Sequence, residues 1–110
     1  MTALLVALGA AVGAPLRYWL SLRFDAGDFP AGTWLANTAG STLLGLFVGL
    51  GADGGSLALL GTGFCGAFTT YSTFATQVVA RGRSGPGYAT LTVLGALGGC
   101  ALGFVAGAQA

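Results

Sequence analysis

The chain has 110 residues, of which 55% are hydrophobic and only 6% are charged. Soluble domains usually carry about 25% charged residues. Four basic and three acidic side chains are too few to cover the surface of a water-soluble globule of this length. The net charge of +1 and the lack of a basic stripe also exclude a nucleic-acid-binding protein.

Four apolar stretches follow one another, and a membrane-spanning helix needs about 20 mostly apolar residues. The first, residues 2–22, has the apolar core of a signal peptide but no basic segment before it, so we interpret it as a retained helix. The others cover residues 32–51, 56–80 and 88–108. Since backbone groups in hydrocarbon must be satisfied internally, we predict an all-α membrane protein of four transmembrane helices in one unit, residues 1–110.

Basic residues are confined to one side of this predicted bundle. Arg17 and Arg23 flank the first connection, and Arg81 and Arg83 lie in the third. The opposite side carries only Asp53 and the terminal amine. By the positive-inside rule, the first and third connections are cytoplasmic, and both termini lie outside the cell membrane.

Glycines recur every four residues along the fourth stretch, at Gly95, Gly99, Gly103 and Gly107. Such a stripe lets another helix approach closely. It is compatible with packing inside the subunit and with a face that binds a second subunit. Four helices alone enclose little room for a pore, so we expect an oligomer.

The third stretch contains the densest group of polar residues, and its middle is a poor helix. Gly66 and the β-branched Thr69 and Thr70 predict a helix broken near its centre. Carbonyls freed at such a break can bind a cation, and freed N–H groups can bind an anion. Tyr71 and Phe74 share one face, where their electropositive ring edges could line an anion path. From spacing alone, two aromatic rings that fill a core are the more common arrangement.

Enzymatic chemistry is not expected. The three aspartates lie in loops, and the chain has no Glu, Lys or His for general acid–base catalysis. Cys65 and Cys100 are not spaced like zinc or redox ligands, so we interpret them as small packing residues.

Three segments carry recognisable motifs. They are Gly13-Ala14-Pro15-Leu16-Arg17-Tyr18 in the first helix, Gly32-Thr33-Trp34-Leu35-Ala36-Asn37-Thr38-Ala39-Gly40 in the second, and Gly63-Phe64-Cys65-Gly66-Ala67-Phe68-Thr69-Thr70-Tyr71-Ser72-Thr73-Phe74 in the third. Together these segments resemble the Fluc/CrcB family of fluoride channels. They occur in the family's order, and the third segment is highly specific.

The resemblance implies an antiparallel dimer with two fluoride pathways, which drains fluoride passively and lowers its toxicity. It also implies a structural sodium ion at the dimer centre, held by the backbone carbonyls of Gly66 and Thr69. Arg17 would have an electrostatic or structural role. The residues expected to line the fluoride pathway are Thr33, Asn37, Tyr71, Ser72, Phe74 and Thr92.

The chain departs from the family pattern at three positions. Tyr71 replaces a phenylalanine, Ala67 replaces a glycine, and Gln77 stands where the family often has Glu. The four-to-zero bias of arginines further predicts a single orientation, hence pairing with an oppositely oriented sister chain. A homodimer is the alternative if the bias still permits both orientations.

Two rival functions remain at this stage. A small multidrug-resistance exporter also has about four helices in this length, but it needs a carboxylate within the membrane, and no span carries one. A non-transporting assembly subunit would need the glycine faces but not the polar group in the third helix.

Overall fold

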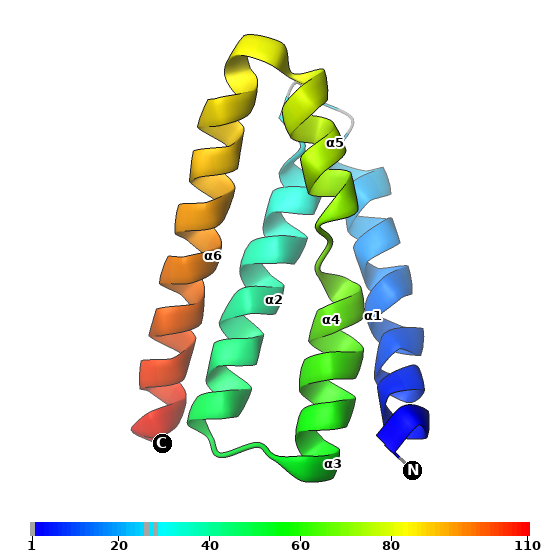
Figure 1. Ribbon diagram of the computed structural model, residues 1–110, viewed down its shortest axis with the longest axis vertical. Coiled ribbons are helices and arrows are strands. Elements are labelled where there is room, and N and C mark those ends of the chain that lie inside the picture. Colours follow the sequence, from blue (N-terminus) through cyan, green and yellow to red (C-terminus); the bar gives the residue numbers. More distant parts are fainter. Residues whose placement is uncertain (1, 26, 28) are drawn as a thin grey trace.

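The computed structural model describes residues 2–25, 27 and 29–110, and within them it contains helices and no strand. Figure 1 shows four helical segments packed side by side along the long axis. The first two are α1 (Thr2–Phe24) and α2 (Ala31–Gly49), and the fourth is α6 (Gly85–Ala108). The third comprises α3 (Gly54–Ser56), the π-helix η1 (Leu57–Cys65), α4 (Gly66–Phe68) and α5 (Ser72–Ala80), and the short 3-10 helix η2 (Gly82–Ser84) follows it.

Both chain ends lie at the same end of the molecule as the connection from α2 to α3 (Figure 1). The connections from α1 to α2 and from α5 to α6 lie at the other end, together with Arg23, Arg81 and Arg83. Gly51 and Gly82 have φ values of +90° and +57° in these turns, which L side chains rarely adopt. Glycine is therefore required where the chain reverses after α2 and after α5.

Two helices are long and apolar enough to cross a bilayer by length and composition, namely α1 and residues 82–108, which contain α6. Helix α2 has 19 residues, and its apolar sequence contains two buried polar residues, Thr33 and Asn37. Large apolar side chains cover the outside, including Leu94 and Leu102, which are 64% and 73% exposed. A surface of this kind suits lipid or other apolar chains and not water, in keeping with a membrane protein.

The glycine stripe of α6 packs inside the subunit, which decides between the two arrangements that the sequence left open. A Cβ atom on Gly103 would collide with the Thr42 carbonyl of α2, and one on Gly107 would meet the Leu46 carbonyl. Helix α1 approaches η1 in the same way, because a Cβ on Gly9 would collide with the Leu59 carbonyl. The subunit is thus held together by backbone-to-backbone contact of two helix pairs, α2 with α6 and α1 with η1.

This packing predicts unequal effects for two neighbouring glycines of α6. Gly103→Val is expected to lower the free energy of unfolding by about 1–3 kcal/mol, because the side chain has no space against α2. A Cβ on Gly98 meets nothing within 4 Å, so Gly98→Val is the matched control and should leave stability unchanged. Thermal unfolding in detergent would measure both variants. Equal losses would contradict the assignment of this stripe to the subunit interior.

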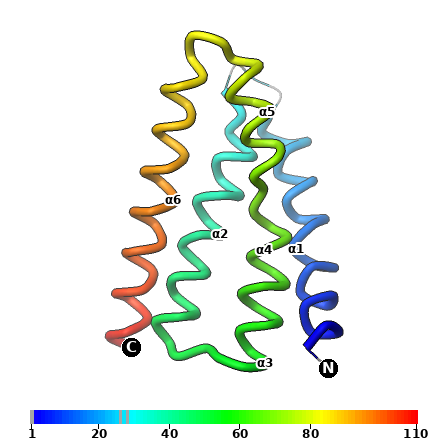
Figure 2. The backbone as a smooth tube through the Cα atoms, viewed as in Figure 1, coloured from blue at the N-terminus to red at the C-terminus, as the bar shows by residue number. Residues whose placement is uncertain are grey.

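The third segment is bent between α4 and α5 (Figure 2). Thr69 adopts an extended backbone, with φ −86° and ψ 163°, and helical geometry resumes at Ser72. The residues at the bend are Thr69, Thr70 and Tyr71, and they include the β-branched pair that the sequence marks as a poor helix.

Candidate functional site

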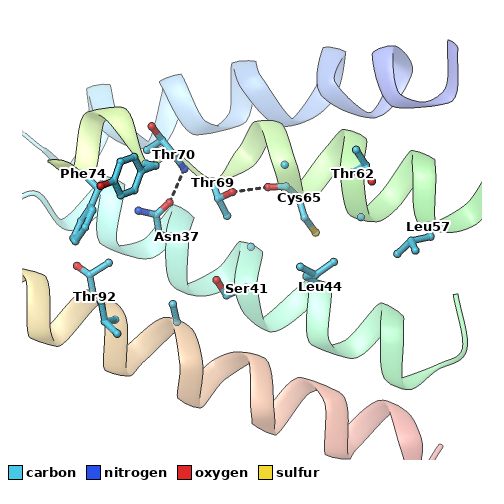
Figure 3. A pocket seen from close by; sticks show the side chains of 16 residues that line it. Asn37, Ser41, Leu44, Leu57, Thr62, Cys65, Thr69, Thr70, Phe74 and Thr92 are labelled. Carbon is cyan, nitrogen blue, oxygen red and sulfur yellow. Dashed lines mark hydrogen bonds between the residues drawn. The ribbon is translucent and has the colours of Figure 1, made fainter. Parts of the chain in front are cut away.

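A groove of about 580 Å³ opens on the molecule beside the bend, between α2, the third segment and α6 (Figure 3). Its wall is apolar for most of its length, with hydroxyl and amide groups set into it. Those polar lining residues are Asn37, Ser41, Thr62, Thr69, Thr70 and Thr92. The groove therefore combines an apolar surface with a small number of fixed hydrogen-bonding groups, as binding sites commonly do.

Asn37 of α2 fixes the bend by replacing a helical hydrogen bond. The Thr70 N–H would donate to the Gly66 carbonyl in an uninterrupted α-helix. Here it donates to Asn37 Oδ1 instead, at 2.7 Å (Figure 3). Asn37 is 7% exposed, so its carbonyl oxygen is a buried acceptor that needs this partner.

A second exchange occurs three residues further along. The Thr73 N–H, which would normally donate to the Thr69 carbonyl, donates to Thr70 Oγ1 at 3.3 Å. The Thr70 hydroxyl, one residue before the N-cap residue Tyr71, thus accepts a hydrogen bond from the first turn of α5. The two exchanges deprive the Gly66 and Thr69 carbonyls of their helical donors, and both residues line the groove.

Arg17 supports the bend from the other side. Its Nε donates to the Ala67 carbonyl at 3.3 Å, although the two residues lie 50 positions apart. The Arg17 guanidinium therefore belongs to the helix packing and places a positive charge next to α4.

The two aromatic residues of the bend both line the groove but differ in exposure. Tyr71 is 79% exposed, whereas Phe74 is partly buried. The Phe74 ring contacts the Tyr71 ring at 6.3 Å and the Tyr88 ring at 5.6 Å, measured between centroids. Phe74 is therefore held by the subunit, and Tyr71 extends away from it.

Among the residues predicted to line a fluoride pathway, the groove brings together Asn37, Tyr71, Phe74 and Thr92. Thr33 and Ser72 do not line it. Thr33 is 0% exposed, and its side chain is engaged with the loop that precedes α2.

That engagement is part of a chain of polar contacts at the arginine-bearing end. The Thr33 N–H and hydroxyl donate to the two carboxylate oxygens of Asp25, at 3.0 and 2.8 Å. Gln77 Nε2 donates to Thr33 Oγ1 at 3.2 Å, and the Tyr88 hydroxyl donates to Gln77 Oε1 at 2.8 Å. Arg81 lies over the Tyr88 ring, 5.8 Å from its centroid.

Sequence reasoning did not single out Asp25 or Tyr88. Asp25 follows the first apolar stretch, and its role as acceptor for the start of α2 depends on its position next to Thr33 in the folded chain. Tyr88 begins the fourth apolar stretch and is 2% exposed. A buried tyrosine hydroxyl usually has a hydrogen-bond partner. A tyrosine within an apolar stretch was therefore the sequence signal for a polar partner such as Gln77.

Comparison with known proteins identifies the family of this chain. Residues 4–108 match the family described as CrcB-like protein, Camphor Resistance (CrcB). The fluoride-specific ion channel FluC 2 of Bacillus subtilis (strain 168) is 50% identical over 96 residues, which cover 84% of this chain and 73% of that protein. The fluoride-specific ion channel FluC of Paramagnetospirillum magneticum is 40% identical over 113 residues, 93% of this chain and 88% of that protein. The chain belongs to the CrcB-like protein family.

Proposed function

We propose that this chain is a subunit of a fluoride-specific ion channel that lets fluoride leave the cell passively and so lowers fluoride toxicity. The observation that supports this most is the groove at the bend, where Asn37, Thr92 and Phe74 come together in a family whose relatives are named fluoride-specific channels. Fluoride is small and strongly hydrated. A selective path must replace its water with hydroxyl, amide and ring-edge donors at a constriction.

The proposed pathway follows the groove past Asn37, Phe74 and Thr92. Thr92 Oγ1 is buried without a hydrogen-bond partner of standard geometry among the described residues, and its hydroxyl lies close enough to that of Tyr88 to interact with it. Tyr71 belongs to the same path. Thr33 and Ser72 do not line the groove, so their part in the fluoride pathway stays a prediction.

A structural sodium ion fits the bend. The Gly66 and Thr69 carbonyls have lost their helical donors, and hard cations prefer oxygen ligands. We propose that these two carbonyls, with the same pair from a partner subunit, hold the ion. When bound, it would supply a fixed positive charge that stabilises the bend and attracts anions.

The proposed partner is a second, oppositely oriented chain that covers the groove. Tyr71 is 79% exposed, and an apolar groove with buried polar groups is not a stable surface against lipid, because hydrocarbon cannot satisfy them. A partner subunit placed over the bend would close the groove into a path and would complete the ligands of the sodium ion.

The distribution of arginines predicts that this partner is a sister chain. Arg17 contacts α4, so it is a packing residue, yet Arg23, Arg81 and Arg83 still lie at one end against no arginine at the other. A topology reporter on the C-terminus, with the chain expressed alone, should give a purely external signal. A mixed inside and outside signal would restore the homodimer.

The function itself is tested by ion release from liposomes. Fluoride should be released and chloride retained, with a sister chain added where the host provides one.

A further inference from the structure

The hydrogen bonds that join Asp25, Thr33, Gln77 and Tyr88 all run in one direction, and Asp25 sets that direction. An ionised carboxylate can only accept hydrogen bonds. The Thr33 hydroxyl oxygen lies 2.8 Å from Asp25 Oδ2, so its single proton must be donated to Asp25. It can then only accept from Gln77.

The remaining assignments follow from this fixed end. Gln77 must turn its NH₂ group toward Thr33, so its carbonyl oxygen faces Tyr88. Tyr88 must then donate its single proton to Gln77. The nitrogen and oxygen of the Gln77 amide need not be told apart directly, because the Asp25 carboxylate at the end of the chain determines which way the amide is turned.

The end of the chain lies against the proposed pathway. The Tyr88 ring contacts the Phe74 ring, and Thr92, one turn later on α6, lines the groove. A tyrosine hydroxyl that faced the groove with a free proton would be a strong donor to an anion. In this structure the proton is committed to Gln77, so Tyr88 cannot hold a passing anion.

We propose that Asp25, which does not line the groove, is a positioning residue for anion passage: it polarises the Thr33–Gln77–Tyr88 chain and thereby withholds the Tyr88 proton from the pathway. The inference rests on the proposed function, because it concerns how tightly fluoride is held near Phe74 and Thr92. An ion path needs sites that bind well enough to admit the ion and weakly enough to release it.

A double-mutant cycle tests the direction of the chain. Asp25→Asn places an NH₂ group against Thr33 Oγ1, which releases the Thr33 proton from position 25. Thr33 can then donate to Gln77, the Gln77 amide can turn to donate to Tyr88, and the Tyr88 proton becomes free. Gln77→Glu places a second carboxylate beside Thr33. The Thr33 hydroxyl has one proton and can donate it to only one of the two carboxylates. In the double variant, the amide at position 25 donates to Thr33, and Thr33 and Tyr88 both donate to the carboxylate at position 77. Every group is satisfied again.

The first readout is independent of transport. The carbon-13 shift of the Tyr88 ring carbon that bears the hydroxyl changes between donor and acceptor states, and it is assigned by its loss in Tyr88→Phe. We expect Asp25→Asn to move this resonance and the double variant to return it to its wild-type position. An unmoved resonance in Asp25→Asn would overturn the proposal.

The second readout is fluoride release from liposomes. Asp25→Asn should slow release roughly tenfold, since one hydrogen bond to a charged group is enough for a change of that size. The double variant should recover most of the rate. Asp53→Asn, which removes the same charge from an exposed loop at the other end, is the matched control and should behave as wild type. A double variant no faster than the slower single variant would overturn the proposal.

Two further outcomes are also decisive. If Asp25→Asn does not fold, the double variant must show a higher thermal midpoint than Gln77→Glu, and an equal or lower midpoint refutes the chain. If the wild-type protein releases no fluoride, the proposed function fails, while the Tyr88 resonance still tests the direction of the chain without any flux.

Discussion

Gly66→Val is expected to abolish fluoride flux while leaving the subunit folded. Among the described residues outside its own helical turn, a Cβ atom on Gly66 would meet only the Gly61 carbonyl within 4 Å, at 3.8 Å, which is ordinary contact. The valine side chain therefore fits inside the subunit and projects into the groove beside the bend. There it would exclude the proposed sodium ion and the partner's helix, and β-branching would disturb α4. Release should fall to the rate of protein-free liposomes.

The control for this variant preserves the backbone and the hydroxyl at the same site. Thr69→Ser keeps the hydrogen bond from Oγ1 to the Cys65 carbonyl, 2.9 Å long, and should retain flux. Thermal unfolding of both variants separates loss of the site from loss of the fold. If Gly66→Val conducts like the wild-type protein, the ion site has been placed at the wrong residues.

Phe74→Ile should reduce fluoride flux more than Tyr71→Ile. Isoleucine keeps the apolar bulk but removes the ring edge, and the Phe74 ring is fixed between the rings of Tyr71 and Tyr88. A loss of roughly tenfold in rate corresponds to an aromatic interaction of about 1.4 kcal/mol. Tyr71 is 79% exposed and less constrained, so its replacement should cost less.

Each variant serves as the other's control, because both remove one ring from the same groove. Initial release rates from liposomes at equal protein content would give the comparison. A fall in flux with Tyr71→Ile alone would assign the working ring to Tyr71 instead.

The helices could be predicted from the sequence because their signals are local. Apolar length marks α1 and α6, and Gly51 and Gly82 mark two of the turns. The weak helical stretch from Gly66 to Thr70 marks the bend, since β-branched residues after a glycine lower helix propensity wherever they occur. The polar residues Asn37 and Thr92 were visible because polar groups are rare in membrane helices.

The contacts that give these residues their roles could not be predicted from spacing. Asn37 lies 33 positions from Thr70, and only the packing of α2 against the third segment makes its amide a substitute for the Gly66 carbonyl. Three hydrogen bonds join Asp25, Thr33, Gln77 and Tyr88 in a row, and each of them links residues from different parts of the chain. The use of the α6 glycine stripe was open for the same reason, because a stripe of small residues fits any close helix and only the fold shows that α2 fills it.

In the proposed function, the groove at the bend belongs to a path for fluoride and not for anions in general. The most direct measurement is the release of fluoride and of chloride from liposomes that contain the purified protein at equal ion gradients, with an ion-selective electrode for each. We predict rapid fluoride release and chloride release no faster than from protein-free liposomes, since only the smaller ion fits a tight constriction that replaces its water with hydroxyl, amide and ring-edge donors. Equal release of the two ions would contradict the account.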